Sequence, residues 1–340
     1  MADEKLVLTK DDLKVLLNKF LEKRTVYAPV SNGRKLDYMS VPDADDVVFS
    51  DELPYKSPKE IFFPRCEKII TFKDGDAVAE ISGEEFLLFG AKPCDLEALD
   101  ILRKIFTEGK FKDPFFEERY KNTLMIGIGC AGKKPGCFCD IRETDLGYSN
   151  KCDLFLGLSK CRNDNDNDSD NENPGYEVLF VSEKGRGAFG PYIPGLSGFE
   201  NAKDEFKPKK TLAIETTEED LFSKVDWGKI VQTCQGCGMC TFICPTCHCF
   251  MFKDVDEGDQ ACRYRNWDSC MFPKFTLHAS GHNPRTEKYE RYRQRIAHKY
   301  LYLSKNFGVI ACTGCGRCVR SCPAGMNIKE VAEGIAEDLK

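Results

Sequence analysis

The spacing of apolar residues predicts that the chain begins with a helix followed by a strand. Residues 8–23 carry an apolar side chain at every third or fourth position, and Thr9 precedes most of them as an N-cap. The apolar positions are Leu13, Leu16, Leu17, Phe20 and Leu21. The next apolar run, residues 25–28, predicts a short strand that ends at Pro29, because proline cannot donate a backbone hydrogen bond.

Residues 31–60 are rich in polar and turn-forming residues and predict loops. Lys59, near the end of this stretch, could face an anionic cofactor. We expect instead that its ammonium group is solvated, as is usual for lysine.

Two later apolar runs each end in glycine and lead to a cysteine. Residues 86–90 precede Cys94, and residues 124–129 precede Cys130. The segment between the two runs has apolar residues at three-residue steps, namely Leu96, Leu99, Leu102 and Ile105. Alternation of strand and helix predicts parallel strands, which place ligand sites beyond their carboxyl ends. If the two strands are neighbours, Cys94 and Cys130 lie at the same edge of the sheet.

Further strands are predicted at residues 151–158 and 176–184, with Cys152 as a small buried hydrophobic residue. Between them, residues 161–173 form an acidic, low-complexity segment that is typical of a mobile surface loop.

Residues 191–208 are rich in proline and glycine and indicate a nearby domain boundary, after which Thr217 opens a helix through Trp227. We therefore predict an α/β (α+β) domain over residues 1–215. A mostly helical, ferredoxin-like domain is predicted over residues 216–340.

The second half of the chain contains the same cysteine motif twice. C-x2-C-x2-C-x3-C-P occurs at residues 234–245 and 312–323. This spacing is typical of bacterial ferredoxins, in which the fourth cysteine of each run ligates the other cluster. It predicts two [4Fe–4S] clusters, one held by Cys234, Cys237, Cys240 and Cys322, and the other by Cys312, Cys315, Cys318 and Cys244. Structural zinc is the alternative, but zinc sites usually divide their cysteines into two pairs.

Four cysteines of the first half predict a third [4Fe–4S] cluster. Sheet topology would bring two of them together, and the short loop after Cys130 contains Gly132 and Gly136, which permit tight turns. Asp95 or Asp140 could add an oxygen ligand. The alternative is a set of thiols without metal. The predicted ligands are Cys94, Cys130, Cys137 and Cys139.

Residues 245–311 separate the two ferredoxin-type runs and hold four further cysteines. A further cluster is one interpretation, but we favour a packed shell whose S–H groups tune the clusters. The four histidines are not spaced as a metal-binding set, so we expect them to be structural. The residues concerned are Cys247, Cys249, Cys262 and Cys270, and His248, His278, His282 and His298.

The cysteine count, the net charge and the lengths of the apolar runs exclude several classes of protein. Nineteen cysteines among 340 residues, an odd number in short spacings, argue against a disulfide framework. Thiolate ligands need a reducing compartment, and the charged start M-A-D-E-K-L is unlike a signal peptide, so we expect a cytoplasmic protein of an anaerobe. No apolar run is long enough for a membrane span. The net charge of −6 disfavours nonspecific nucleic-acid binding.

Several motifs together resemble one family. They are S-P-K-E-I-F-F-P at 57–64, P-C-D-L at 93–96, C-F-C at 137–139, W-D-S-C at 267–270, H-K-Y at 298–300 and the two cysteine runs. The chain resembles the iron–sulfur electron-transfer subunit of anaerobic sulfite reductase and the beta subunit of sulfhydrogenase-type [NiFe] hydrogenases. The resemblance implies a protein that relays single electrons between an FAD- and NAD(P)H-binding flavoprotein and a catalytic reductase or hydrogenase subunit.

Two other functions compete with this interpretation. One is a free-standing, ferredoxin-like electron carrier, and the other is an iron–sulfur regulator or nucleic-acid enzyme. The G-I-G-C run lacks the later glycine of a dinucleotide fingerprint, so we assign no flavin or nicotinamide site to this chain. We also find no nucleophile–base pair that would indicate a self-contained active site.

Overall fold

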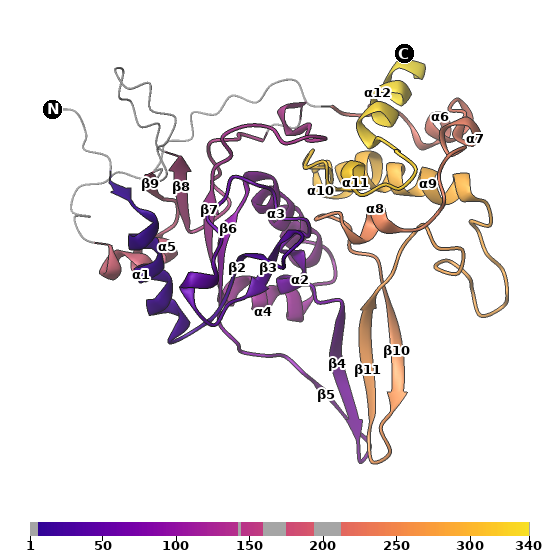
Figure 1. Cartoon of the computed structure of the whole chain (residues 1–340). Coiled ribbons are helices and arrows are strands. Elements are labelled where there is room, and N and C mark those ends of the chain that lie inside the picture. Colours follow the sequence, from indigo (N-terminus) through magenta and orange to yellow (C-terminus); the bar gives the residue numbers. More distant parts are fainter. Residues whose placement is uncertain (1–5, 142–143, 159–174, 194–211, 340) are drawn as a thin grey trace, which may run out of the picture.

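The computed structural model describes residues 6–141, 144–158, 175–193 and 212–339. A seven-stranded sheet with helices on both faces forms one side of the molecule, and short helices of the C-terminal region gather on the other side (Figure 1). A second, four-stranded sheet projects away from both. The acidic segment 161–173 lies outside the described residues.

The large sheet is mainly parallel at its centre. Strands β2, β6, β7 and β8 run parallel to one another, whereas β1, β3 and β9 pair antiparallel at the two sides. In spatial order the strands are β1 (Val7–Leu8), β9 (Tyr176–Phe180), β8 (Leu154–Leu158), β7 (Thr123–Ile128), β6 (Phe86–Ala91), β2 (Thr25–Ser31) and β3 (Leu36–Ser40). The prediction that the strands before Cys94 and Cys130 are parallel is confirmed, and the two strands are also neighbours.

Strand β2 continues beyond the proline at which it was predicted to end. Pro29 lies within β2 and pairs with Tyr38 of β3. The pairing of β2 with β6 stops at Tyr27, so the missing N–H of Pro29 interrupts no hydrogen bond with β6.

Helices cover both faces of this sheet. Helices α1 (Lys10–Leu21) and α5 (Glu183–Phe189) pack on one face. The other face is covered by α2 (Lys59–Phe62), α3 (Pro93–Thr107) and α4 (Pro114–Asn122). Short 3-10 turns are η1 (Ala44–Asp46), η2 (Cys139–Ile141) and η3 (Gly190–Tyr192).

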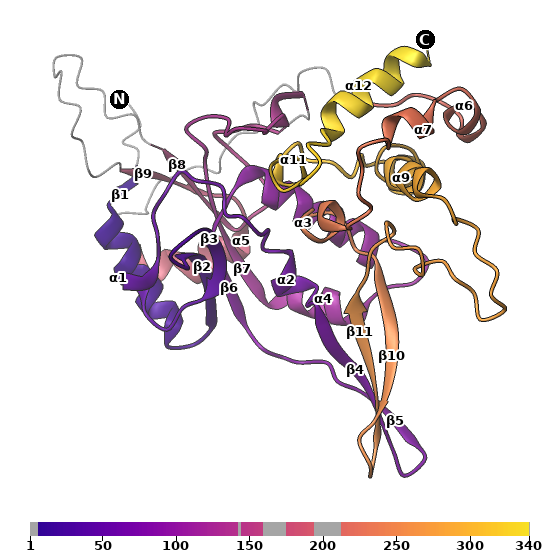
Figure 2. The same ribbon diagram turned by 45° about the vertical axis from the view of Figure 1, so that its right-hand side comes forward.

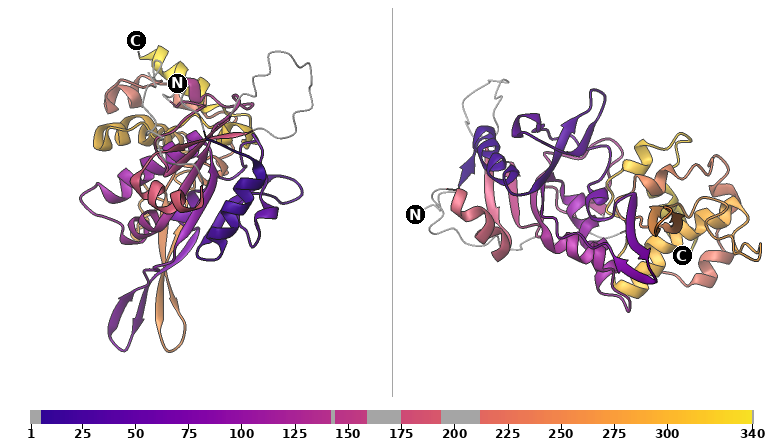
Figure 3. Two further views of the ribbon diagram at one scale, coloured as in Figure 1. Left: turned by 90° about the vertical axis from the view of Figure 1, so that its left-hand side faces the viewer. Right: turned by 90° about the horizontal axis from the view of Figure 1, so that it is seen from below.

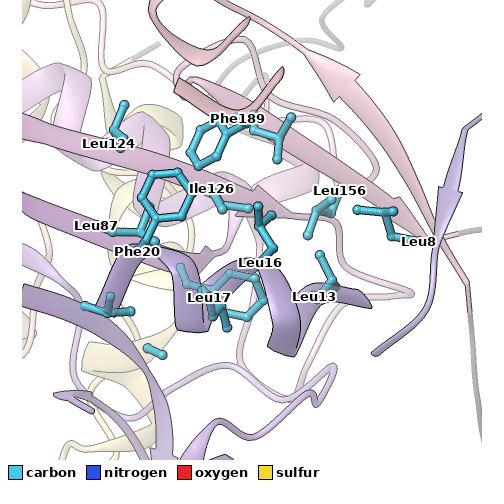
Figure 4. Packing of buried hydrophobic residues seen from close by; sticks show 14 of the residues in the cluster. Leu8, Leu13, Leu16, Leu17, Phe20, Leu87, Leu124, Ile126, Leu156 and Phe189 are labelled. Carbon is cyan, nitrogen blue, oxygen red and sulfur yellow. The ribbon is translucent and has the colours of Figure 1, made fainter. Parts of the chain in front are cut away.

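The first helix shows how the sequence builds this core. The Thr9 hydroxyl accepts from the backbone N–H of Asp12, whose carboxylate accepts from the N–H of Thr9, so the start of α1 is capped from both sides. The predicted apolar stripe then packs on the sheet (Figure 4). Each fully buried leucine or phenylalanine stabilises the fold by about 1.5–3 kcal/mol. Figure 4 labels Leu13, Leu16, Leu17 and Phe20 of α1 in one cluster with Leu87, Ile126 and Leu156 of the sheet.

The smaller sheet joins two hairpins that are distant in the sequence. Its strands, all antiparallel, are β10 (Phe250–Asp256), β11 (Ala261–Trp267), β4 (Cys66–Lys73) and β5 (Asp76–Ala79). The hairpin of β10 and β11 belongs to the region that was predicted to be mostly helical, and that part of the prediction is not confirmed. Because β11 pairs with β4, this sheet also connects residues on both sides of the predicted domain boundary.

The remaining C-terminal elements are short helices. The helix predicted from Thr217 through Trp227 is two helices, because the chain turns between them. The elements are α6 (Glu218–Ser223), α7 (Trp227–Ile230), α8 (Met239–Phe242), α9 (Lys288–Ala297), the π-helical turn η4 (His298–Tyr302), α10 (Leu303–Phe307), α11 (Arg317–Arg320) and α12 (Ile328–Asp338). Figures 2 and 3 show the C-terminal helices grouped away from α1, and Leu303 of α10 packs with Ile101 of α3.

Candidate iron–sulfur sites

The first ferredoxin-type run forms one wall of a cavity beside helix α8. Cys234, Cys237 and Cys240 line this cavity, and Cys322 of the second run lines it with them. The loop folds tightly because Gly236 and Gly238 adopt positive φ angles of 66° and 75°, a region that other residues rarely occupy. Cys318 and Cys322 of the second run both line this cavity, so the exchange of fourth ligands stays a prediction.

The second run gathers around a cysteine of the first. Cys244, Cys312 and Cys315 are buried, and helices α8 and α11, which follow the two loops, pack together. Burial raises the pKa of Cys315 to about 11 and that of Cys318 to about 12, and nearby Cys244 contributes to both increases. Such thiols would stay protonated at neutral pH, so iron binding would have to displace their protons.

The four cysteines predicted in the N-terminal region line one cavity. Its wall includes the four thiol-bearing residues together with Lys133 and Lys134. Cys94 stands in the first turn of α3, directly after β6, and the Cys130 loop begins after β7, so the parallel strands deliver both to the same edge. The other two cysteines, on the returning loop, are Cys137 and Cys139.

The N-terminal cysteine loop lies directly on the second ferredoxin-type loop. The thiol of Cys137 donates to the carbonyl oxygen of Cys315 at 3.2 Å, and the N–H of Phe138 donates to the carbonyl of Gly314 at 2.8 Å. A β-carbon on Gly314 would lie 2.6 Å from the backbone nitrogen of Cys139. A β-carbon on Gly316 would lie 2.2 Å from the carbonyl oxygen of Gly136. These glycines therefore permit contact between the two loops, a role that the sequence did not reveal.

A buried ion pair connects the same two sites. Arg317, next to Cys318, donates to both carboxylate oxygens of Asp95, next to Cys94, at 2.5 and 2.9 Å. Its Nε donates to the carbonyl of Pro54 at 2.9 Å. Asp95, considered above as an oxygen ligand, is thus held by an arginine. Asp140, the other candidate, pairs with Lys133 at 2.8 Å.

Comparison with known proteins identifies the family. Residues 233–326 match a family described as a 4Fe-4S dicluster domain. The chain is 30% identical over 337 residues to sulfhydrogenase 2 subunit beta of Pyrococcus furiosus, and the match covers 95% of each chain. The chain belongs to the sulfhydrogenase beta-subunit family.

Membership of the sulfhydrogenase beta-subunit family and the dicluster domain together make the chain an iron–sulfur electron-transfer subunit of an oxidoreductase. No solved structure matches the chain. Among the described residues, no helix is both long and apolar enough to cross a membrane.

In this sulfhydrogenase beta-subunit homologue, Lys59 is not solvated, and the prediction for it was wrong. Only 2% of its surface is exposed, and its ammonium group donates to the carbonyls of Cys244 at 2.9 Å and Cys247 at 2.8 Å. It also lies 4.0 Å from the centre of the Trp267 ring. Burial lowers the pKa of Lys59 to about 8, while the neighbouring cysteines oppose that shift. The signal available in the sequence was the S-P-K-E-I-F-F-P motif, which places the lysine at the start of an apolar helix.

Arg295 provides a test of whether anionic clusters fit this region. It is 2% exposed and lines the Cys234 cavity, together with Cys240 and Cys318. Its Nε and Nη2 atoms are buried and have no hydrogen-bond partner among the described residues. A buried guanidinium group without a partner is costly, and an anion beside it offsets that cost. A thiolate-bound iron–sulfur cluster is such an anion.

Three of the remaining cysteines, Cys247, Cys249 and Cys270, lie close to other cysteines. A hydrogen bond between the two thiols lowers the pKa of Cys244 and raises that of Cys247. The ammonium group of Lys299 also donates to the Cys244 sulfur at 3.2 Å. A similar bond from Cys270 lowers the pKa of Cys249 to about 7. These contacts are those of a hydrogen-bonding shell.

Cys262 is set apart from this group. It lies on β11, 3.8 Å from the hydroxyl of Thr71. Among the described residues, no group of three or more His, Cys, Asp or Glu side chains is arranged to hold a single metal ion. A cluster spreads its ligands over several iron atoms, so this observation concerns single-ion sites such as zinc.

The four histidines take part in structural contacts. The Nδ1 of His248 lies 3.0 Å from the carbonyl oxygen of Thr246, and its ring lies 5.3 Å from that of His298. Burial lowers the pKa of His248 to about 4 and that of His298 to about 3, so both rings are neutral at pH 7. His278 and His282 lie together in a loop, with ring centres 5.4 Å apart.

Proposed function

We propose that the chain holds three [4Fe–4S] clusters and conducts single electrons between two partner subunits. One partner would be an FAD- and NAD(P)H-binding flavoprotein, and the other a catalytic reductase or hydrogenase subunit. The observation that carries the proposal is that all four N-terminal cysteines line one cavity, whose loop contacts the second ferredoxin-type run.

The first and third proposed ligand sets each line one cavity, and the second set rests on the exchange of fourth ligands between the runs. Iron–sulfur clusters would supply reversible one-electron chemistry, with potentials set by hydrogen bonds, charge and burial. The first site would use Cys234, Cys237, Cys240 and Cys322, the second Cys244, Cys312, Cys315 and Cys318, and the third Cys94, Cys130, Cys137 and Cys139.

The second site stands between the other two. It shares the neighbourhood of Arg295 with the first site, since this arginine lies near both Cys240 and Cys318. It shares the Arg317–Asp95 pair and the Cys137–Cys315 hydrogen bond with the third. This arrangement supports a chain of three sites in the order first, second, third.

Buried cations would stabilise the reduced, more negative state of the clusters. Lys59 and Lys299 donate to atoms of Cys244, and Arg295 lies near thiols of the first two sites. Because the charges of these side chains are poorly screened when buried, they should raise the reduction potentials of the nearby clusters.

Metal analysis of cysteine variants tests the number of clusters. Three [4Fe–4S] centres correspond to about twelve irons per anaerobically reconstituted chain. Changing Cys137 and Cys139 together to Ser should remove about four irons and leave the ferredoxin-type signals in place. Cys66→Ser is the matched control, because Cys66 is exposed on β4, outside all three sites.

About eight irons in the reconstituted wild type, unchanged in the double variant, would refute the third cluster. Co-purification of the tagged chain from its native cells, with a flavoprotein and a catalytic subunit, would support the relay. Isolation as a free monomer under the same conditions would contradict it.

A further inference from the structure

A large cavity with an apolar floor opens at the carboxyl edge of the parallel strands. It encloses about 640 Å³, which lies within the usual range of sites for small organic ligands. Phe89 of β6 and Ile128 of β7 form part of the floor, and Phe49 and Tyr176 add aromatic surface. In parallel sheets, this edge is where ligands generally bind.

One end of this cavity is polar and carries a buried ammonium group. Lys92, 2% exposed, lines the cavity at the residue before α3. Its Nζ lies 3.3 Å from the carbonyl oxygen of Ser50, 3.5 Å from that of Gly129 and 3.8 Å from a carboxylate oxygen of Asp51. None of these contacts is short, and Asp51 also pairs with Lys134. An oxygen atom of a ligand would therefore give the buried ammonium group of Lys92 a closer hydrogen-bond acceptor.

The cavity borders the proposed third cluster site. Asp51 and Cys130 line both this cavity and the one formed by the four N-terminal cysteines. A ligand in the cavity would thus lie against the loop that carries a proposed cluster ligand. Such contact suits a molecule that exchanges electrons with the cluster, and a conducting chain needs a donor or acceptor at each end.

We propose that this cavity binds a planar, redox-active ring that bears a carbonyl oxygen, of the flavin or quinone class. Lys92 would bind the carbonyl oxygen, and the aromatic floor would contact the ring. Electron exchange rests on the proposed third cluster, whereas binding of the ring does not. The absence of a glycine fingerprint fits a bound ring better than a bound dinucleotide.

Each transfer oxidises one reduced cluster and delivers one electron to the ring. Two electrons, with two protons from water, convert the ring to its dihydro form. The partner flavoprotein would renew the electrons in the cell, and dithionite supplies them in the test.

Equilibrium dialysis of the reconstituted full chain with menadione or FMN tests the binding. We expect about one ring bound per chain, and a preference between the two probes would distinguish a quinone from a flavin site. Lys92→Met should weaken binding about tenfold, because a hydrogen bond to a charged group is lost. Lys305→Met, on the exposed surface of α10, is the control for loss of one positive charge.

A second variant keeps the test decisive if Lys92→Met fails to fold. Gly157 lines the cavity, and a β-carbon there would meet only Glu177, at 3.7 Å, so Gly157→Val should fold and narrow the cavity. We expect it also to weaken binding about tenfold. Equal affinity in the wild type and both variants, or no binding of either probe, would overturn the proposal.

Iron content separates the two proposals. About twelve irons without ring binding would refute the ring site and leave the three-cluster chain intact. About eight irons with ring binding would support the cavity as a ligand site and refute electron exchange through a third cluster. Reoxidation of dithionite-reduced clusters by the bound probe, slowed in Gly157→Val, would support both.

Discussion

The ferredoxin-type sites and the N-terminal cysteine site bring their thiols together by different means. In the C-terminal region, short fixed spacings and glycines with positive φ angles place three cysteines of each run on one loop. In the N-terminal region, parallel strands place Cys94 and Cys130 at one edge, and a loop adds two more. A ligand set can therefore be encoded by local spacing or by the topology of a sheet.

The two regions also differ in what their surroundings contribute. Buried cations that face the thiols, such as Arg295 and Lys299, gather near the ferredoxin-type sites. The N-terminal site instead has Lys92, Lys133 and Lys134, each of which pairs with Asp51 or Asp140. We therefore expect the N-terminal cluster to have the lowest reduction potential of the three.

The largest effect should come from replacing the fourth cysteine of each ferredoxin-type run. Cys322→Ala should eliminate the cluster on Cys234, Cys237 and Cys240, about four irons, although all four cysteines of that run remain. Cys244→Ala should eliminate the other ferredoxin-type cluster. Mössbauer and EPR spectra of the two variants will show which cluster is absent. If each variant loses the cluster of its own run, the exchange is refuted.

The second largest effect should come from the ion pair between the regions. Asp95→Ala leaves the guanidinium group of Arg317 buried without its carboxylate, which should lower the free energy of unfolding by about 3–5 kcal/mol. The double variant Asp95→Leu with Arg317→Met should recover much of that loss, since no charge remains buried. Anaerobic denaturant unfolding measures both. Equal loss in the single and double variants would contradict this assignment.

Two glycines distinguish the effect of a positive φ angle from the effect of contact between the two cysteine loops. Gly236 and Gly314 share a φ angle of 66°, but a β-carbon has open space at Gly236 and meets the backbone of Cys139 at Gly314. Gly314→Ala should therefore displace the N-terminal loop and remove up to about four irons, whereas Gly236→Ala should cost about 1 kcal/mol of stability. Iron analysis of the two variants measures this difference. Identical iron content in both would contradict the contact between the two loops.

The smallest expected effect is a change in reduction potential when the buried charge of Arg295 is removed. Arg295→Met should lower the potentials of the first and second clusters, by about 60 mV for each 1.4 kcal/mol of lost stabilisation, and leave the third unchanged. Arg293→Met, a neighbour that stacks on Phe222 at 3.8 Å, is the control. Redox-monitored EPR gives the potentials. A uniform shift of all three clusters would mean that Arg295 acts through global structure.

Local patterns predicted much of this molecule. The apolar stripe of α1, the parallel strands before Cys94 and Cys130, and helix α3 are as expected, because each is specified by residues close in sequence. The hairpin of β10 and β11 was missed because Cys262, which lies in it, was interpreted as part of a packed shell around the clusters. Its partner strand β4 lies nearly two hundred residues earlier, so no local signal connects them.

The contacts that single out Lys59 and the Asp95–Arg317 pair could not be predicted from the sequence alone. The S-P-K-E-I-F-F-P motif places Lys59 at the start of an apolar helix, but only folding brings it to the carbonyls of Cys244 and Cys247. Arg317 and Asp95 belong to different predicted domains, and only the docking of the two cysteine loops makes them partners.

Spin counting by EPR on the fully reduced wild-type chain tests the central claim most directly. Three [4Fe–4S] clusters should give about three unpaired spins per chain, with broadening from magnetic coupling between neighbouring sites. The Cys137→Ser and Cys139→Ser double variant should give about two, with less coupling at the second cluster. About two spins in the wild type, with a spectrum identical to that of the double variant, would contradict the account.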